Sequence, residues 1–110
     1  MLAQADKILF KVHLEYDSKF DLQNQNNGIF VAIQKERLLK SIPETVELLS
    51  AQEDVLNKWL IRARTSFAYA KDANMIKKVE TTRNAILELI KHLYSLLSYL
   101  EVSSAPAENK

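Results

Sequence analysis

The chain has 110 residues, a formal net charge of +1, 47% hydrophobic residues and 26% charged residues, which is the size and balance of one ordinary globular domain. It contains no cysteine, and this excludes disulfides, thiolate metal sites and cysteine nucleophiles. The single glycine and the two prolines are too few for the many tight turns of a β-sandwich or barrel. These features predict a protein built from few, long elements.

The first residues, MLAQADK, lack the basic and apolar regions of a signal peptide. No stretch reaches the roughly 18 uninterrupted apolar residues that a membrane span needs. We therefore expect a cytoplasmic protein with no membrane partner.

Residues 8–16 allow two interpretations. From Phe10 onward apolar and polar residues alternate, as in a half-buried strand, and a turn after Tyr16 would complete a hairpin over 8–22 in an α+β fold. As a helix, the segment leaves Phe10 and Leu14 on one side and gathers the other apolar residues on the opposite face: Ala5, Ile8, Leu9, Val12, Tyr16 and Phe20. An isolated hairpin is marginally stable, so the helix is favoured. Phe10 and Leu14 then need a cover, either a second helix or another copy of the chain.

Three further helices are predicted downstream. A loop over 23–28, rich in Asn and Gln, precedes a short helix at 29–42. Ser41-Ile42-Pro43-Glu44 has the spacing of a capping box with proline in the first turn, so a new helix is expected to start there. Asp72 or Asn74 is expected to cap the last helix.

The last two predicted helices each carry an apolar seam with one polar member. The first seam contains Glu53 among Val46, Leu49, Leu56, Leu60, Ala63, Phe67 and Ala70. The second seam contains Arg83 among Ile76, Val79, Ile86, Ile90, Leu93, Leu97 and Leu100. If the chain reverses near Ala73, every member finds a partner and Arg83 lies opposite Ala63. The arginine stem then packs while its head reaches the edge, or it makes a buried polar contact that sets the register.

The sequence thus predicts an all-α four-helix bundle built on a long antiparallel helical hairpin. Residues 1–102 form one helical domain, and residues 103–110, which are small and polar, form a disordered tail.

Motifs for chemistry are absent from the sequence. His13 and His92 have no partners at metal-ligand spacing; Glu88 shares a helix face with His92, but the repeated Glu-x-x-His of di-iron bundles is missing. The only glycine follows two asparagines, so no glycine-rich phosphate loop exists. We expect no metal, no cofactor and no catalytic residues.

Two surfaces remain as candidates for binding. Bases gather near the predicted hairpin tip, with Trp59 and Tyr69 interleaved: Lys58, Arg62, Arg64, Lys71, Lys77 and Lys78. Such a cluster could follow a phosphate backbone, although a solvated helix face has the same composition. The last helix is apolar beyond its seam, either because it is central or because it forms an interface. The candidate interface comprises Phe10, Leu14, Leu89, Leu96 and Tyr99.

These observations favour a non-catalytic helical interaction protein, such as an adaptor, a chaperone-like protein or an assembly subunit. It would act through protein–protein contact and self-associate as a homodimer or larger oligomer, because a small chain has little interior in which to bury this apolar surface. The alternative is a nucleic-acid-binding accessory subunit that uses the basic residues of 58–78.

Overall fold

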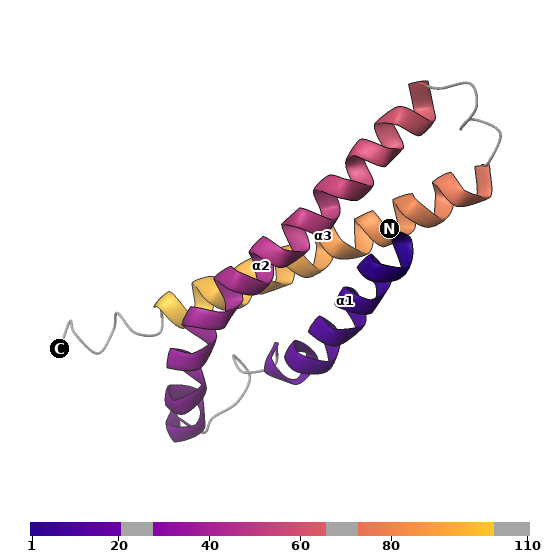
Figure 1. The fold of residues 1–110 in the computed structure, drawn as a ribbon. Helices are drawn as coiled ribbons and strands as arrows, with labels where there is room; N and C mark the ends of the chain where they lie inside the picture. The colour runs from indigo at the N-terminus through magenta and orange to yellow at the C-terminus, as the bar shows by residue number, and fades with distance from the viewer. Residues whose placement is uncertain (21–27, 66–72, 103–110) are drawn as a thin grey trace.

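The structure is a computed structural model that describes residues 1–20, 28–65 and 73–102, and the side chains of these residues except 28–34 and 102. These ranges contain three α-helices, α1 (Leu2–Tyr16), α2 (Gly28–Thr65) and α3 (Ala73–Val102), with a short 3-10 helix η1 (Asp17–Lys19) after α1 (Figure 1). The predicted all-α class is confirmed, and no strand occurs in the described ranges. The predicted tail at 103–110 and most of the predicted loop lie outside them.

Helix α1 settles the two interpretations of the first segment in favour of a helix. Its buried residues recur every three or four positions: Ala5, Leu9, Val12 and Tyr16. Ile8 and Phe20 pack against this core from its edge. Phe10 and Leu14 lie on the opposite side and are exposed, because a helix of 3.6 residues per turn cannot place them with the others.

The helix break that was expected at Ser41 does not occur in α2. It runs without interruption from Gly28 to Thr65 and contains Pro43, so the two helices predicted for this part of the chain are one. The Ser41 side chain is engaged elsewhere, since its hydroxyl hydrogen bonds with the hydroxyl of Tyr16 at 2.7 Å. Proline lacks the backbone N–H and crowds the preceding turn, which bends a helix. Figure 1 shows α2 changing direction in its N-terminal part.

Helices α2 and α3 lie side by side and antiparallel (Figure 1). Their seams supply most of the core, and the fully buried members include Leu49, Leu56, Leu60, Val79, Ile86, Leu93 and Leu100. The other α3 seam positions, Ile76, Ile90 and Leu97, are only partly buried. Phe67 and Ala70 of the α2 seam, and the capping candidate Asp72, lie outside the described residues.

The polar residues of the two seams contact each other. Arg83 Nη2 lies 3.5 Å from Glu53 Oε1, and the side chains are 29% and 21% exposed. Arg83 was expected opposite Ala63, and its long side chain reaches along α2 to the carboxylate of Glu53. Arg64 pairs with Glu80 across the same two helices, which is within two residues of the predicted register. The head of Arg83 meets a counter-charge there, and a half-buried guanidinium without one is costly.

Helix α1 covers the flank of α3 that α2 leaves open. Thr82 Oγ1 donates a hydrogen bond to Asp6 Oδ1 at 3.0 Å, and the rings of Phe20 and His92 lie 5.8 Å apart. These contacts place α1 parallel to α3. The apolar arc of α3 is wide because it serves two neighbours, with α2 on one side and α1 on the other.

Candidate protein-interaction surface

The outer face of α1 carries two large apolar side chains in solvent. Phe10 is 64% exposed and Leu14 is 70% exposed, and residues four positions apart on a helix lie next to each other. They form one contiguous patch on the face that points away from the core. The described side chains of α2 leave both residues exposed, so the second helix that was expected as one possible cover does not bury them.

Charged residues of opposite sign stand at the two ends of this patch. Lys7 precedes Phe10 by three positions, Asp17 follows Leu14 by three positions, and both are exposed. Asp17 Oδ1 lies 2.8 Å from His13 Nδ1, so its second carboxylate oxygen can accept a further bond. The described residues give Lys7 no ion pair.

The other predicted interface residues do not belong to this surface. Leu89 and Leu96 are only 1% and 5% exposed, so their assignment to an exposed interface is wrong. They lie on the flank of α3 that carries Thr82, at seven-residue spacing, and Leu96 lines the same small pocket as Phe20. Tyr99 is partly buried against the core. Leu89 and Leu96 are buried because α1 packs on this flank of α3.

A second apolar surface lies on α3 on the flank that carries Arg83. Leu87 and Tyr94 are exposed and line a shallow hollow of about 610 Å³ together with Ile90, Lys91, Ser95 and Ser98. Two serines and a lysine make this hollow more polar than the α1 patch.

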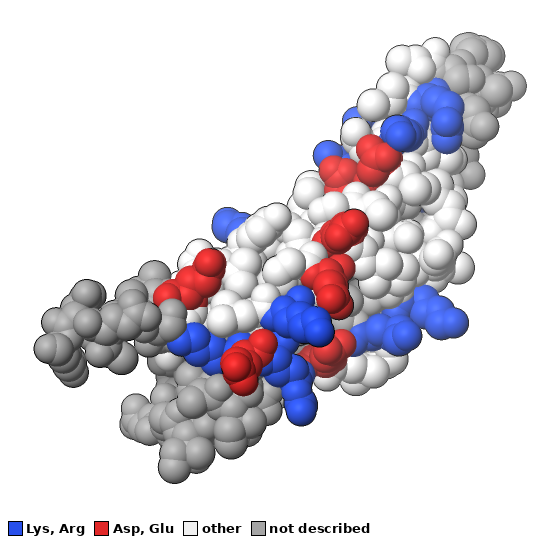
Figure 2. Space-filling view, turned by 60° about the vertical axis from the view of Figure 1, so that its left-hand side comes forward, with Lys and Arg blue, Asp and Glu red and all other residues white. Residues whose placement is uncertain are grey.

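Some residues of the predicted basic cluster form ion pairs with acidic residues, and others do not. Lys58 Nζ lies 3.0 Å from Asp54 Oδ2, and Arg64 pairs with Glu80 across the two helices. Arg62, Lys77 and Lys78 are exposed and have no ion pair among the described residues, whereas Lys71 lies outside them. Figure 2 shows basic and acidic side chains close to one another near the upper end of the molecule. The potential of the cluster is therefore lower than its composition suggests.

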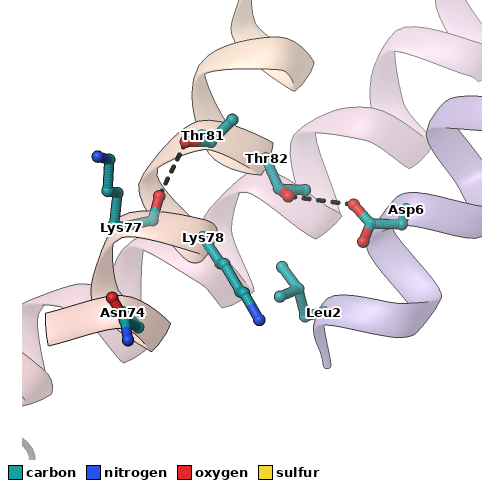
Figure 3. A pocket seen from close by; sticks show the side chains of 7 residues that line it. All are labelled: Leu2, Asp6, Asn74, Lys77, Lys78, Thr81 and Thr82. Atoms are coloured by element: carbon teal, nitrogen blue, oxygen red, sulfur yellow. Dashed lines mark hydrogen bonds between the residues drawn. The ribbon is translucent and has the colours of Figure 1, made fainter. Parts of the chain in front are cut away.

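A cavity of about 460 Å³ opens between the first turns of α1 and α3 (Figure 3). The Lys78 side chain reaches across it toward Leu2, whereas the Lys77 side chain points away. Asp6 lies on the opposite side, and its carboxylate accepts a hydrogen bond from the Thr82 hydroxyl. A cation and an anion face the same cavity, so it has no single charge preference.

The described residues hold no group of three or more histidines, aspartates or glutamates that could bind a metal ion. His92 Nε2 lies 3.7 Å from Glu88 Oε1 in an exposed pair. No described helix is both long and apolar enough to cross a membrane. Comparison with protein-family models, with curated proteins and with solved structures found no match.

Sequence reasoning did not single out Lys7 and Asp17 as partners of the apolar patch. The signal was present, because Lys7, Phe10, Leu14 and Asp17 recur at alternating spacings of three and four, the pattern of a coiled-coil seam. Tyr16 was expected in the core, but its role as a hydrogen-bonding anchor required knowledge of which α2 hydroxyls it meets.

Proposed function

We propose that this protein is a non-catalytic helical interaction protein, an adaptor or assembly subunit, and that the outer face of α1 is its contact surface. The observation that supports this most directly is the exposure of Phe10 and Leu14 on adjacent turns. Single exposed apolar residues are common on soluble proteins. Two large ones that form a patch rimmed by charges are typical of a protein-contact surface.

The energetics favour a role for this patch in contact. Each exposed apolar Å² removed from water contributes about 25 cal/mol. The inner face of α1 already fills the core through Leu9, Val12 and Tyr16, so folding of one chain does not require Phe10 or Leu14 to be apolar. Burial of these two residues against a partner protein does require them to be apolar.

The proposal is tested with the double variant Phe10→Glu/Leu14→Glu and the matched control Leu48→Glu/Val55→Glu. The control residues are also exposed apolar residues, but they lie on α2. Both variants should keep the helical circular dichroism of the parent, because neither pair contributes to the core. Each tagged protein is then expressed in the cells from which the sequence comes and purified with whatever it binds. Each bound protein is identified, produced in pure form and tested again for binding to the parent and to the two variants.

We expect the parent and the α2 control to bind one defined protein, which can be a second copy of this chain. The α1 variant should not bind that protein. If the parent binds no protein and does not self-associate at high micromolar concentration, the proposal is wrong. Binding that survives in the α1 variant and disappears in the α2 control would also contradict it, because the contact surface would then lie on α2.

A second candidate function is nucleic-acid binding by the basic end of the α2–α3 pair. It is favoured by Arg62, Lys77 and Lys78, which are exposed and have no acidic partner among the described residues. Replacement of all three with glutamine should remove any nucleic acid that co-purifies and lower the salt dependence of binding by about one unit of slope for each lost phosphate contact. A parent free of nucleic acid at low salt would exclude this candidate.

A further inference from the structure

Helix α1 carries two seams on opposite sides. The inner seam packs in the core. The outer seam consists of Lys7, Phe10 and Leu14 of α1 and of Asp17, the C-cap of α1 and first residue of η1, whose backbone is still in the right-handed helical region. Positions i, i+3, i+7 and i+10 line one side of a helix as a and d positions line a coiled coil. Its centre is apolar, its first position is a cation and its last position is an anion.

We infer that the partner on this face is a second copy of the same chain, bound through an antiparallel, two-fold symmetric contact between the two α1 helices. This inference rests on the proposed function and names its partner. When the outer seam is laid against itself in the opposite direction, Phe10 packs on Leu14 of the partner subunit. Lys7 then lies at the height of Asp17 of the partner subunit, and the two-fold axis repeats both contacts.

Charge complementarity selects this direction. A parallel pairing would bring Lys7 beside Lys7 of the partner subunit and Asp17 beside Asp17 of the partner subunit, and like charges at these positions oppose association. The antiparallel pairing converts both repulsions into attractions. It also gives the a-to-d layering that antiparallel coiled coils use, with a large aromatic facing a leucine in each central layer.

Lys11 marks the position of the two-fold axis. It lies beside the outer seam, between Phe10 and Leu14 in sequence, so the two copies of Lys11 approach each other near the axis. Both are exposed, and their repulsion weakens the dimer. Removal of this charge should therefore strengthen self-association, an effect that no surface distant from the axis would show.

The contact is small. Helix α1 has 15 residues, and interfaces below about 1,200 Å² are characteristic of weak or transient complexes. We therefore expect a dimer in rapid exchange with monomer at micromolar or higher concentration.

Sedimentation velocity over a concentration series tests the contact. The weight-average mass of the parent should rise toward twice that of one chain, and Leu14→Glu should remain monomeric. Lys7→Asp alone should weaken the dimer roughly tenfold, because the axis doubles each lost ion pair. The exchanged variant Lys7→Asp/Asp17→Lys should recover the parental affinity, and Lys11→Gln should exceed it. Leu48→Glu is the control that should change nothing.

Disulfide trapping tests the direction, because the chain has no native cysteine. In a mixture of Lys7→Cys and Asp17→Cys, the antiparallel contact joins one variant to the other. It keeps two Lys7→Cys chains apart, since their thiols lie about ten residues, or 15 Å, apart along the axis and a disulfide needs Cα atoms within about 7 Å. Trapping of Lys7→Cys with itself would show a parallel contact and overturn the inference.

The outcomes separate this inference from the proposed function. A parent that stays monomeric but binds a different protein through Phe10 and Leu14 overturns the inference and leaves the proposed function intact. A dimer that is insensitive to Leu14→Glu but sensitive to Tyr94→Glu overturns it as well, since the contact would then use α3. A parent that binds neither itself nor another protein overturns both.

Discussion

The antiparallel pair α2–α3 and the short helix α1 bury apolar residues in different ways. The pair is held by successive layers along two long seams, with fully buried residues such as Leu49, Leu60 and Leu93 spread over its length. Helix α1 contributes one inner stripe, and polar contacts hold both of its ends: Asp6 with Thr82 at the start and Tyr16 with Ser41 at the end. The difference indicates that most of the core lies between α2 and α3, and that α1 adds one further buried stripe.

The largest expected effect tests the pair. Leu60→Ala removes a fully buried side chain and should lower the free energy of unfolding by about 2–5 kcal/mol, because it leaves a cavity in the core. Leu48→Ala makes the same chemical change on the same helix at an exposed position and should cost a small fraction of that. Urea unfolding measures both. Equal losses would mean that the seam of α2 is not the centre of the core.

A smaller effect is expected where α1 meets α2. The Tyr16 hydroxyl hydrogen bonds with Ser41 Oγ at 2.7 Å and Thr45 Oγ1 at 3.2 Å. Tyr16→Phe leaves these partly buried hydroxyls without their partner and should lower the free energy of unfolding by about 1–3 kcal/mol. Hydrogen exchange should quicken at the α1 amides while the centre of α2 and α3 keeps its protection.

Tyr94→Phe is the matched control, because Tyr94 is exposed on α3. A loss from this variant as large as that from Tyr16→Phe would show that the Tyr16 hydroxyl does not anchor α1. Uniformly faster exchange across all three helices would instead show that α1 and the pair unfold as one unit.

The smallest effect concerns the charged layer inside the pair. Glu53→Leu leaves the guanidinium of Arg83 partly buried without its counter-charge and should cost about 1–2 kcal/mol, between the values for exposed and fully buried ion pairs. The double variant Glu53→Leu/Arg83→Leu should recover most of this loss, since two apolar residues suit the seam.

The exposed pair of Lys58 and Asp54 is the control for that layer, and Lys58→Ala should change stability by less than about 0.5 kcal/mol. If the losses of the two single variants of Glu53 and Arg83 simply add in the double variant, the side chains do not act as a pair.

Several features followed from the sequence alone. The scarcity of glycine and proline and the recurrence of apolar residues every three or four positions predicted helices. The helical interpretation of residues 8–16 correctly separated Leu9 and Val12 from Phe10 and Leu14. The helical period acts over one or two turns, so neighbouring residues contain most of the information about which residues share a face. For residues 8–16 the local alternation also fitted a strand, and the helix was favoured because an isolated hairpin is marginally stable.

Contacts between distant segments decided the rest. Ser41 has the spacing of a helix cap, but its hydroxyl meets Tyr16, and α2 continues through Pro43. Leu89 and Leu96 are apolar whether they face solvent or a neighbour, and only the docking of α1 buries them. In each case the local pattern was compatible with two outcomes, and the choice depended on a side chain from another helix that the pattern does not contain.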